Sequence, residues 1–216
     1  VTEVGTVTSL WGQFQDGERT KSLCKEVMKP NISLLTDVSA LSLNTELYKV
    51  GHYYPGGAHS AIFAVYDDGT LLWLDDHSSN RDFNLFWQRE NINWHDAHEA
   101  AIFMMATKFH YLPEPSRAII VNNVDDIPQA RLRDFLIERN ATEELERLEQ
   151  GLADIAPHLN PPSLIIKGQE TQLQFCVWIM VGGCAWSITC LFNSEGELSY
   201  QGNKLGCGIG EIFMPR

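Results

Sequence analysis

Three residues within the first 75 positions have the types and the chain order that catalysis by a cysteine nucleophile requires. Cys24 lies in a segment that fits a short helix, His59 directly precedes a predicted strand, and Asp75 directly follows the next one. In such an arrangement the imidazole deprotonates the thiol and the carboxylate orients the imidazole. The sequence therefore offers Cys24, His59 and Asp75 as a candidate catalytic triad.

The order of these three residues resembles that of papain-like cysteine enzymes of the transglutaminase and arylamine acetyltransferase type. In that family the cysteine opens a helix, the histidine starts a strand and an acidic residue lies at the next strand, so the resemblance implies a cysteine enzyme. A second interpretation is a structural thiol, because Leu23, Val27 and Met28 share the predicted helix side of Cys24. A reactive thiolate needs an exposed, cationic setting, so we expect a buried Cys24.

A second group of chemistry-bearing side chains is His95, His98 and Glu99. Residues three and four apart lie on one helix face, so two imidazoles and a carboxylate here could hold a metal ion. The spacing HxxHE differs from the HExxH of zinc proteases, and His98 lies near an apolar stripe that includes Trp94 and Ile102. We therefore predict a solvated pair of His95 and Glu99, a core His98, no tightly bound metal and no cofactor.

Gly206, Gly208 and Gly210 form a GxGxG string of the kind found in nucleotide-binding loops. A loop that cradles phosphate must run into a helix, and no helix follows this string in a sequence that ends at Arg216. We predict a loop or a strand edge. No Walker-type lysine motif, CxxC pair or GxSxG elbow occurs in the sequence.

The elements that would position these residues are clearest in residues 172–200. Folding this stretch about Gly182-Gly183 as a two-residue hairpin turn places Trp186 on a wholly apolar face. Trp178 then lies on the opposite, mixed face, which we expect to be half-solvated. A further turn and a short strand, residues 197–200, complete a three-stranded meander.

A similar pattern occurs in residues 47–74, where Gly56-Gly57 and Asp67-Asp68-Gly69 separate three predicted strands. Aligning the two stretches at their double glycines matches several apolar positions. An internal duplication of the meander is one interpretation of this match. Hairpin turn chemistry, which favours GG and DG pairs in any case, is the other.

Helical sequence separates the two meanders. Asn93 can cap one helix, Pro128 can open a second, and Asn140 can cap a third. We predict an α+β fold in a single domain, with an antiparallel sheet and three or four helices packed against it. The sheet is built from the two meanders, at about 47–74 and 172–200.

Charge favours some partner classes over others. Lys and Arg total 16 and Asp and Glu total 28, so the net charge is −12. Such a field repels phosphate backbones and anionic membranes and attracts basic proteins. No apolar run approaches the roughly 18 residues of a membrane span. We expect a basic protein partner, no nucleic acid and no membrane.

Cysteine usage bears on the compartment. The count of five is odd, and Cys176, Cys184 and Cys190 lie inside apolar strand patterns. Disulfide scaffolds place their cysteines at regular loop positions instead. The sequence therefore predicts a reducing, cytoplasmic location.

Residues 58–122 run as a strand, a DG turn, a second strand, a polar loop, a helix beginning at His95, a Pro-x-Pro-x-Arg segment and a short strand. This layout resembles the small acidic immunity proteins that neutralise bacterial toxins in polymorphic toxin systems. The resemblance implies a protein-binding module that occludes a toxin site and has no catalytic residues. On this interpretation Trp178, Asp67 and Asp68 are the candidate binding residues, because an aromatic side chain in an acidic surround is a typical anchor for a basic partner.

Overall fold

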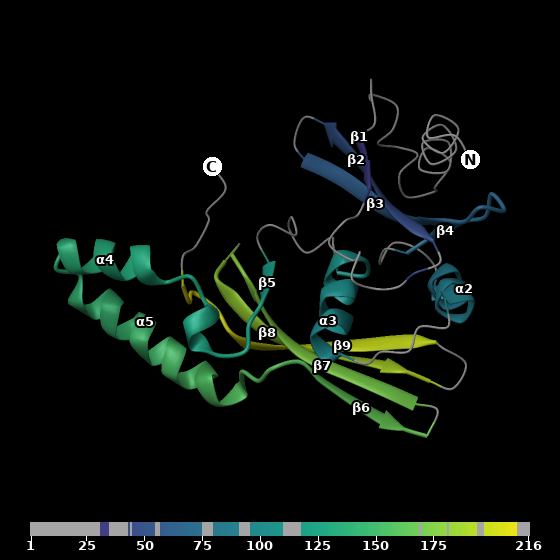
Figure 1. Cartoon of the computed structure of the whole chain (residues 1–216). Helices are drawn as coiled ribbons and strands as arrows, with labels where there is room; N and C mark the ends of the chain where they lie inside the picture. Colours follow the sequence, from purple (N-terminus) through teal and green to yellow (C-terminus); the bar gives the residue numbers. More distant parts are fainter. Residues whose placement is uncertain are drawn as a thin grey trace. The chain divides into compact units, whose positions relative to one another are not determined.

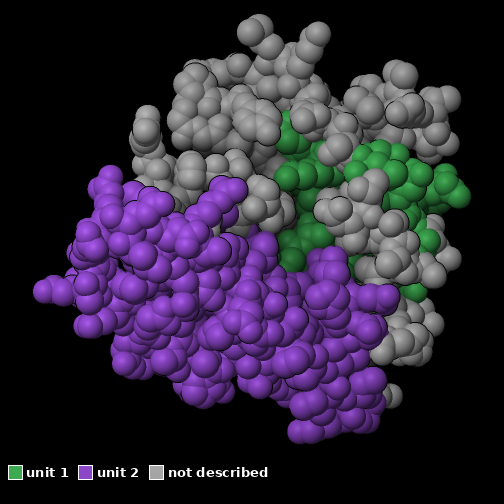
Figure 2. All heavy atoms as spheres, turned by 60° about the vertical axis from the view of Figure 1, so that its left-hand side comes forward, with its two compact units in different colours: residues 1–94, 103–111 green, residues 95–102, 112–216 purple. Residues whose placement is uncertain are grey.

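The computed structural model shows a chain that forms two compact units (Figure 1 and Figure 2). Unit 1 comprises residues 1–94 and 103–111, and unit 2 comprises residues 95–102 and 112–216. The predicted α+β class is confirmed, because the chain contains antiparallel sheets and helices. The single domain and the internal duplication stay predictions. The structure describes residues 31–34, 43, 45–54, 57–74, 80–90, 96–109, 118–168, 170–180, 182–193 and 197–210.

Unit 1 contains a four-stranded antiparallel sheet with the strand order β1-β2-β3-β4. Strands β2 to β4 form the predicted first meander, but Gly57 lies in β3 opposite Tyr54 and not in the connection where the sequence analysis placed it. The turn between β3 and β4 places Gly69 at a φ of 83°, a conformation that glycine adopts without steric cost. The middle of β3 is buried on both faces, since Ile62 and Phe63 are both 0% exposed. The bounds are β1 Asn31–Leu34, β2 Glu46–Tyr54, β3 Gly57–Val65 and β4 Leu71–Trp73.

Helix α2, Asn80–Glu90, follows this sheet. Phe83 and Phe86 lie three residues apart on one helix face and are fully buried. The Asp82 carboxylate accepts the backbone N–H of Trp73 at 3.1 Å, which links the helix to β4. The prediction of a polar loop in this region is therefore wrong, because two aromatic residues at helical spacing outweigh the polar residues around them.

Helix α3, Ala97–Ala106, begins later than the sequence predicts. The Asp96 carboxylate accepts the backbone N–H groups of His98 at 2.7 Å and Glu99 at 3.0 Å. These are the bonds of an N-cap residue. Asp96 therefore takes the capping role that the sequence analysis gave to Asn93, which lies outside the described residues.

Unit 2 contains a five-stranded antiparallel sheet, and its strands β7 to β9 are the predicted second meander. Two short strands share one side of β7. Strand β5 pairs with residues 177–179, and β6 pairs with residues 170–174. The bounds are β5 Ala118–Ile120, β6 Ser163–Lys167, β7 Glu170–Ile179, β8 Cys184–Phe192 and β9 Leu198–Gly206.

The register between β7 and β8 differs from the predicted one by two residues. Val177, and not Ile179, lies opposite Trp186, and Trp178 lies opposite Ala185. The ladder stops at Ile179, so the connection is residues 180–183 and not the two glycines alone. Because the shift is even, the predicted faces are retained. Trp186 lies on the face of Val177, and Trp178 lies on the other.

The burial of these two faces is the reverse of the expectation. Trp178 is 1% exposed, whereas Trp186 is only partly buried. Helices α4, Ala130–Glu138, and α5, Thr142–Ile155, form a hairpin (Figure 1), and α5 contributes one apolar stripe to a core cluster around Trp178. The buried members of this Trp178 cluster are Val121, Ile127, Leu136, Leu148, Leu152, Ile155, Leu159, Cys176, Trp178, Ala185 and Ile209.

The connections of this hairpin also correct one prediction. Two short 3-10 helices flank it, η4 at Val124–Asp126 and η5 at Ala156–His158. Asn140 does not cap α5: it has a φ of 53°, and Ala141 occupies the N-cap position without a side-chain bond. Asn140 instead makes the tight turn between the two helices, a conformation that asparagine tolerates better than most residues.

The glycine string forms the end of β9 and the loop after it, which fits the predicted loop or strand edge, although β9 continues six residues beyond the predicted end at Tyr200. Gly206 is the last residue of β9, and Gly208 and Gly210 follow with φ values of 74° and 80°. Cys207, between them, forms a disulfide with Cys184. This bond was not expected from the sequence, because Cys184 is the first residue of β8 and fits an apolar strand pattern.

Candidate functional site

The candidate triad cannot be assembled from the described residues. Cys24 and Asp75 lie outside them. His59 lies on β3, where its backbone pairs with His52 of β2. The cysteine-enzyme interpretation and the burial of Cys24 therefore stay predictions.

Two of the three candidate metal ligands, His98 and Glu99, lie in the first turn of α3. His98 and Glu99 are both exposed, and His95 lies outside the described residues. The prediction of a core His98 is wrong, because the buried side of α3 carries Ala100, Ala101, Phe103 and Met104 instead. In the part of the chain that the structure describes, no three His, Cys, Asp or Glu residues form a group that could hold a metal ion.

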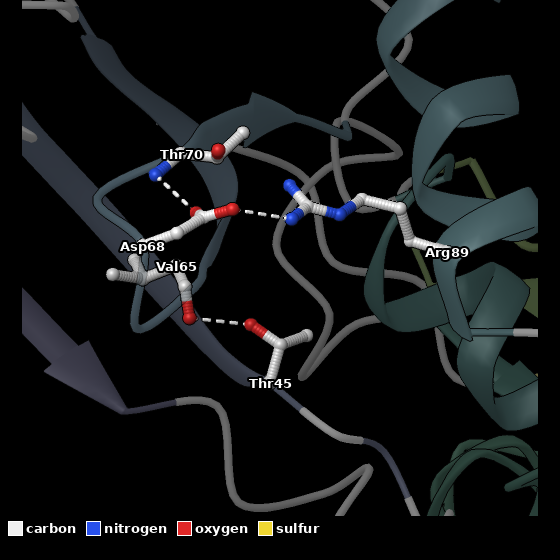
Figure 3. Close-up of polar contacts among 5 residues, drawn as sticks. All are labelled: Thr45, Val65, Asp68, Thr70 and Arg89. Atoms are coloured by element: carbon white, nitrogen blue, oxygen red, sulfur yellow. Dashed lines mark hydrogen bonds and ion pairs between the residues drawn. The ribbon is translucent and has the colours of Figure 1, made fainter.

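The Asp67-Asp68 turn between β3 and β4 makes polar contacts with Thr70 and with helix α2 (Figure 3). Arg89 reaches from α2 and pairs with Asp68, with 2.5 Å between Nη2 and Oδ2. The other Asp68 oxygen accepts the backbone N–H of Thr70 at 2.8 Å. The Arg89 guanidinium also lies 4.1 Å from the centre of the Tyr66 ring, a cation–π contact. Asp68 thus joins the turn to the end of α2.

These contacts determine the charge of the turn. Hydrogen bonds from Thr70 and Arg89 lower the pKa of Asp68 to about 2. Burial raises the pKa of the Tyr66 phenol well above its usual value, and the neighbouring Glu90 carboxylate adds to the rise. Asp68 is therefore ionised, but its charge is balanced by Arg89. It forms a structural link between two elements and is a poor anchor for a basic partner.

We expect the contribution of Asp68 to stability to be lost only in strong acid. The pKa of Asp68 is lowered from 3.8 to about 2 in the folded chain. The ionised carboxylate therefore stabilises the fold fully above pH 3.8, and this stabilisation is lost as the pH falls through about 2. In the variant Arg89→Gln the pKa of Asp68 should rise toward its ordinary value, which a carboxyl NMR titration would measure. Arg147→Gln, on α5, is the control and should leave it unchanged. An unchanged value in Arg89→Gln would show that Thr70 alone holds the carboxylate.

The three predicted binding residues have different outcomes. Asp67 is exposed at the tip of the turn. Asp68 is paired with Arg89. Trp178 is buried, and its indole Nε1 donates to the backbone oxygen of Ile209 at 2.8 Å. The half-solvated position predicted for Trp178 is wrong, because the helical hairpin and residues after β9 cover that face.

Two large exposed apolar residues that were not predicted lie on helix α4, and others among the described residues lie on β1, α2, β6, β8 and β9. Phe135 is 46% exposed and Ile137 is 60% exposed. The Arg139 guanidinium stacks on the Phe135 ring, 4.4 Å from its centre, and covers part of it. The sequence does contain a signal for this exposure. Phe135, Leu136 and Ile137 are consecutive, and three consecutive residues of a helix cannot all face one core. Ile137 is therefore the more accessible of the two.

The helical hairpin that carries Ile137 is acidic. The acidic hairpin, as we call residues 130–155, contains seven carboxylates, all exposed, and four arginines, which leaves a net charge of −3. Arg133 pairs with Glu149 at 2.7 Å and links α4 to α5, and Arg147 pairs with Glu143 within α5 at 3.7 Å. The seven carboxylates are Asp134, Glu138, Glu143, Glu144, Glu146, Glu149 and Asp154.

Comparison of the chain with known protein families, curated proteins and solved structures finds no match. Among the described helices, none combines the length and the apolar character that crossing a bilayer would need. The cytoplasmic location stays a prediction.

Proposed function

We propose that the chain is a protein-binding module whose acidic hairpin docks on a basic protein. The observation that carries the proposal is Ile137, an isoleucine 60% exposed on a helical hairpin of net negative charge. An exposed apolar side chain within a polar rim is typical of interaction sites. The carboxylates of the hairpin would steer a basic partner toward this surface.

The rigidity of the hairpin supports this choice of surface. Leu148, Leu152 and Ile155 fix α5 in the Trp178 cluster, and the Arg133–Glu149 pair fixes α4 against α5. A pre-organised surface loses little conformational entropy when it binds. The Asp67-Asp68 turn supports the proposal less, because Arg89 already balances Asp68.

In its specific form the proposal is an immunity protein that occludes the active site of a basic toxin. The layout of residues 58–122 and the acidic hairpin support this form. A toxin that acts on nucleic acid has a positively charged active-site surface, since it must hold a phosphate backbone. An acidic module can occupy that surface, and no catalytic residue is needed for inhibition.

Binding to immobilised basic nuclease domains of bacterial toxins tests the proposal, with hen lysozyme as an equally basic control protein. We expect at least one nuclease domain to bind at about 0.15 M salt and lysozyme not to bind. Ile137→Ala should weaken that binding roughly 10- to 30-fold, as expected for a central apolar anchor. Glu144→Lys with Glu146→Lys should slow association and reduce its salt dependence.

Ile166→Ala is a matched control for Ile137→Ala. Ile166 lies on β6 of the same unit and is 59% exposed, against 60% for Ile137. The Ile166→Ala variant should leave the affinity for the nuclease domain unchanged. Equal losses in both variants would show that the hairpin is not the docking surface. Failure of every nuclease domain to bind would remove the immunity form of the proposal.

A further inference from the structure

The disulfide between Cys184 and Cys207 joins the first residue of β8 to the residue after β9. Cys207 is exposed and Cys184 is partly buried, so the bond is within reach of a reductant. The other described cysteines are unsuited to redox exchange. Cys176 and Cys190 are buried, and burial raises the pKa of the Cys190 thiol to about 12.

The bond holds a short segment in place over the Trp178 cluster. Beyond β9, the N–H groups of Gly208 and Ile209 donate to the backbone oxygens of Gly182 and Gly183 at 3.1 and 3.0 Å. The Ile209 side chain is 2% exposed and belongs to the cluster. Its backbone oxygen accepts the indole N–H of Trp178 at 2.8 Å. Residues 207–210, here called the closing segment, are thus held by two hydrogen bonds to Gly182 and Gly183, one from Trp178 and the buried Ile209 side chain.

The closing segment is also held by packing, because Gly210 is buried close to Ile127, Pro128 and Trp178. The β8–β9 ladder ends at the pair of Ala185 and Gly206. Gly208 and Gly210 contribute no side chains, and both adopt a positive φ. A glycine gains more conformational freedom than any other residue when its segment is released. The covalent bond therefore adds to the hydrogen bonds and packing that hold a segment which conformational entropy favours releasing.

We propose that the Cys184–Cys207 disulfide is a redox-sensitive latch, whose reduction by a dithiol releases the closing segment and opens the Trp178 cluster beneath α5. A thiolate of the dithiol attacks the exposed Cys207 sulfur, the S–S bond breaks, and Cys184 leaves as a thiolate that takes up a proton. The second thiol of the reductant then displaces Cys207, which is protonated in turn. The reductant departs as its own disulfide, having given two electrons to the cysteine pair.

Native-state hydrogen exchange tests the latch in the full chain, with dithiothreitol as the reductant. On reduction, the indole N–H of Trp178 and the amide N–H of Ile209 should exchange at least tenfold faster, because local opening becomes easier. Amides of β2 and β3 in unit 1 should be unaffected. The double variant Cys184→Ser, Cys207→Ser should show the fast exchange without reductant and no further response to it.

Two results would overturn the latch. Unchanged exchange at Trp178 and Ile209 after reduction, with two additional thiols titrated, would show that the bond restrains nothing. Exchange that rises equally at all amides would show that the bond supports the whole fold and not this segment. Neither result depends on a binding partner, so the latch and the proposed docking surface fail independently.

Discussion

Truncation of Trp178 to alanine should reduce the free energy of unfolding by roughly 3–5 kcal/mol, the range for a fully buried aromatic side chain. In the native fold the ring is 1% exposed and lies within the Trp178 cluster, and its indole N–H donates a 2.8 Å hydrogen bond that the substitution removes. The truncation also leaves the Ile209 backbone oxygen without that donor, which adds to the cost. Denaturant unfolding followed by far-UV circular dichroism measures the loss.

Trp186→Ala is the control for this prediction. Trp186 lies across from Val177 on the other face and is only partly buried, with the Lys204 ammonium 5.7 Å from its ring. Its truncation should cost clearly less, because its side chain removes less apolar area from water. A larger loss of unfolding free energy in Trp186→Ala than in Trp178→Ala would contradict the packing of α5 on the Trp178 face of the sheet.

Alanine at Gly210 should be among the most destabilising small substitutions in the described part of the chain. A Cβ there would lie 2.7 Å from Cγ2 of Ile127, 2.9 Å from the backbone oxygen of Pro128 and 3.1 Å from Cζ2 of Trp178. The crowding should cost about 1–3 kcal/mol. The positive φ adds about 1–2 kcal/mol for a residue with a side chain. Denaturant unfolding of the purified Gly210→Ala variant measures the sum of the two contributions.

Gly208→Ala separates these two contributions. Gly208 has a φ of 74°, close to the 80° of Gly210, but a Cβ there meets nothing within 4 Å. This variant should show only the backbone cost of about 1–2 kcal/mol. Equal losses at the two positions would mean that the segment gives way and that Gly210 is not closely packed.

Turn chemistry made both meanders predictable from the sequence. Gly69, Gly182 and Gly183 adopt positive φ values, as double-glycine and Asp-Gly turns require. The register between β7 and β8 was less predictable. A pair of glycines can form a two-residue turn by itself, or it can be part of a longer connection. In this chain the N–H of Gly183 bonds the oxygen of Met180 at 3.1 Å, and the strands end outside that bond.

Features that depend on distant residues could not be predicted. Burial of Trp178 follows from α5 lying on its face, and strand alternation alone does not reveal which face a helix will cover. The pairing of Cys184 with Cys207 depends on the β8–β9 register, because spacing does not determine connectivity. Neutralisation of Asp68 depends on Arg89, in a helix that the sequence analysis did not predict. The exposed Ile137 on α4 is a different case, because the run Phe135-Leu136-Ile137 in a predicted helix already shows that the three cannot share one buried face.

Four of the five strands of the unit 2 sheet come from one stretch of chain, residues 163–206, and each is hydrogen-bonded to the next in sequence. Strand β5 is the exception: Ala118 pairs with Ile179, which closes a loop of roughly 60 residues. The entropy of long-range loop closure therefore opposes one strand alone, while the other four have low contact order. Helices α4 and α5 lie inside that same loop. The pairing of β5 with β7 therefore completes the sheet and also brings α5 onto the face of Trp178.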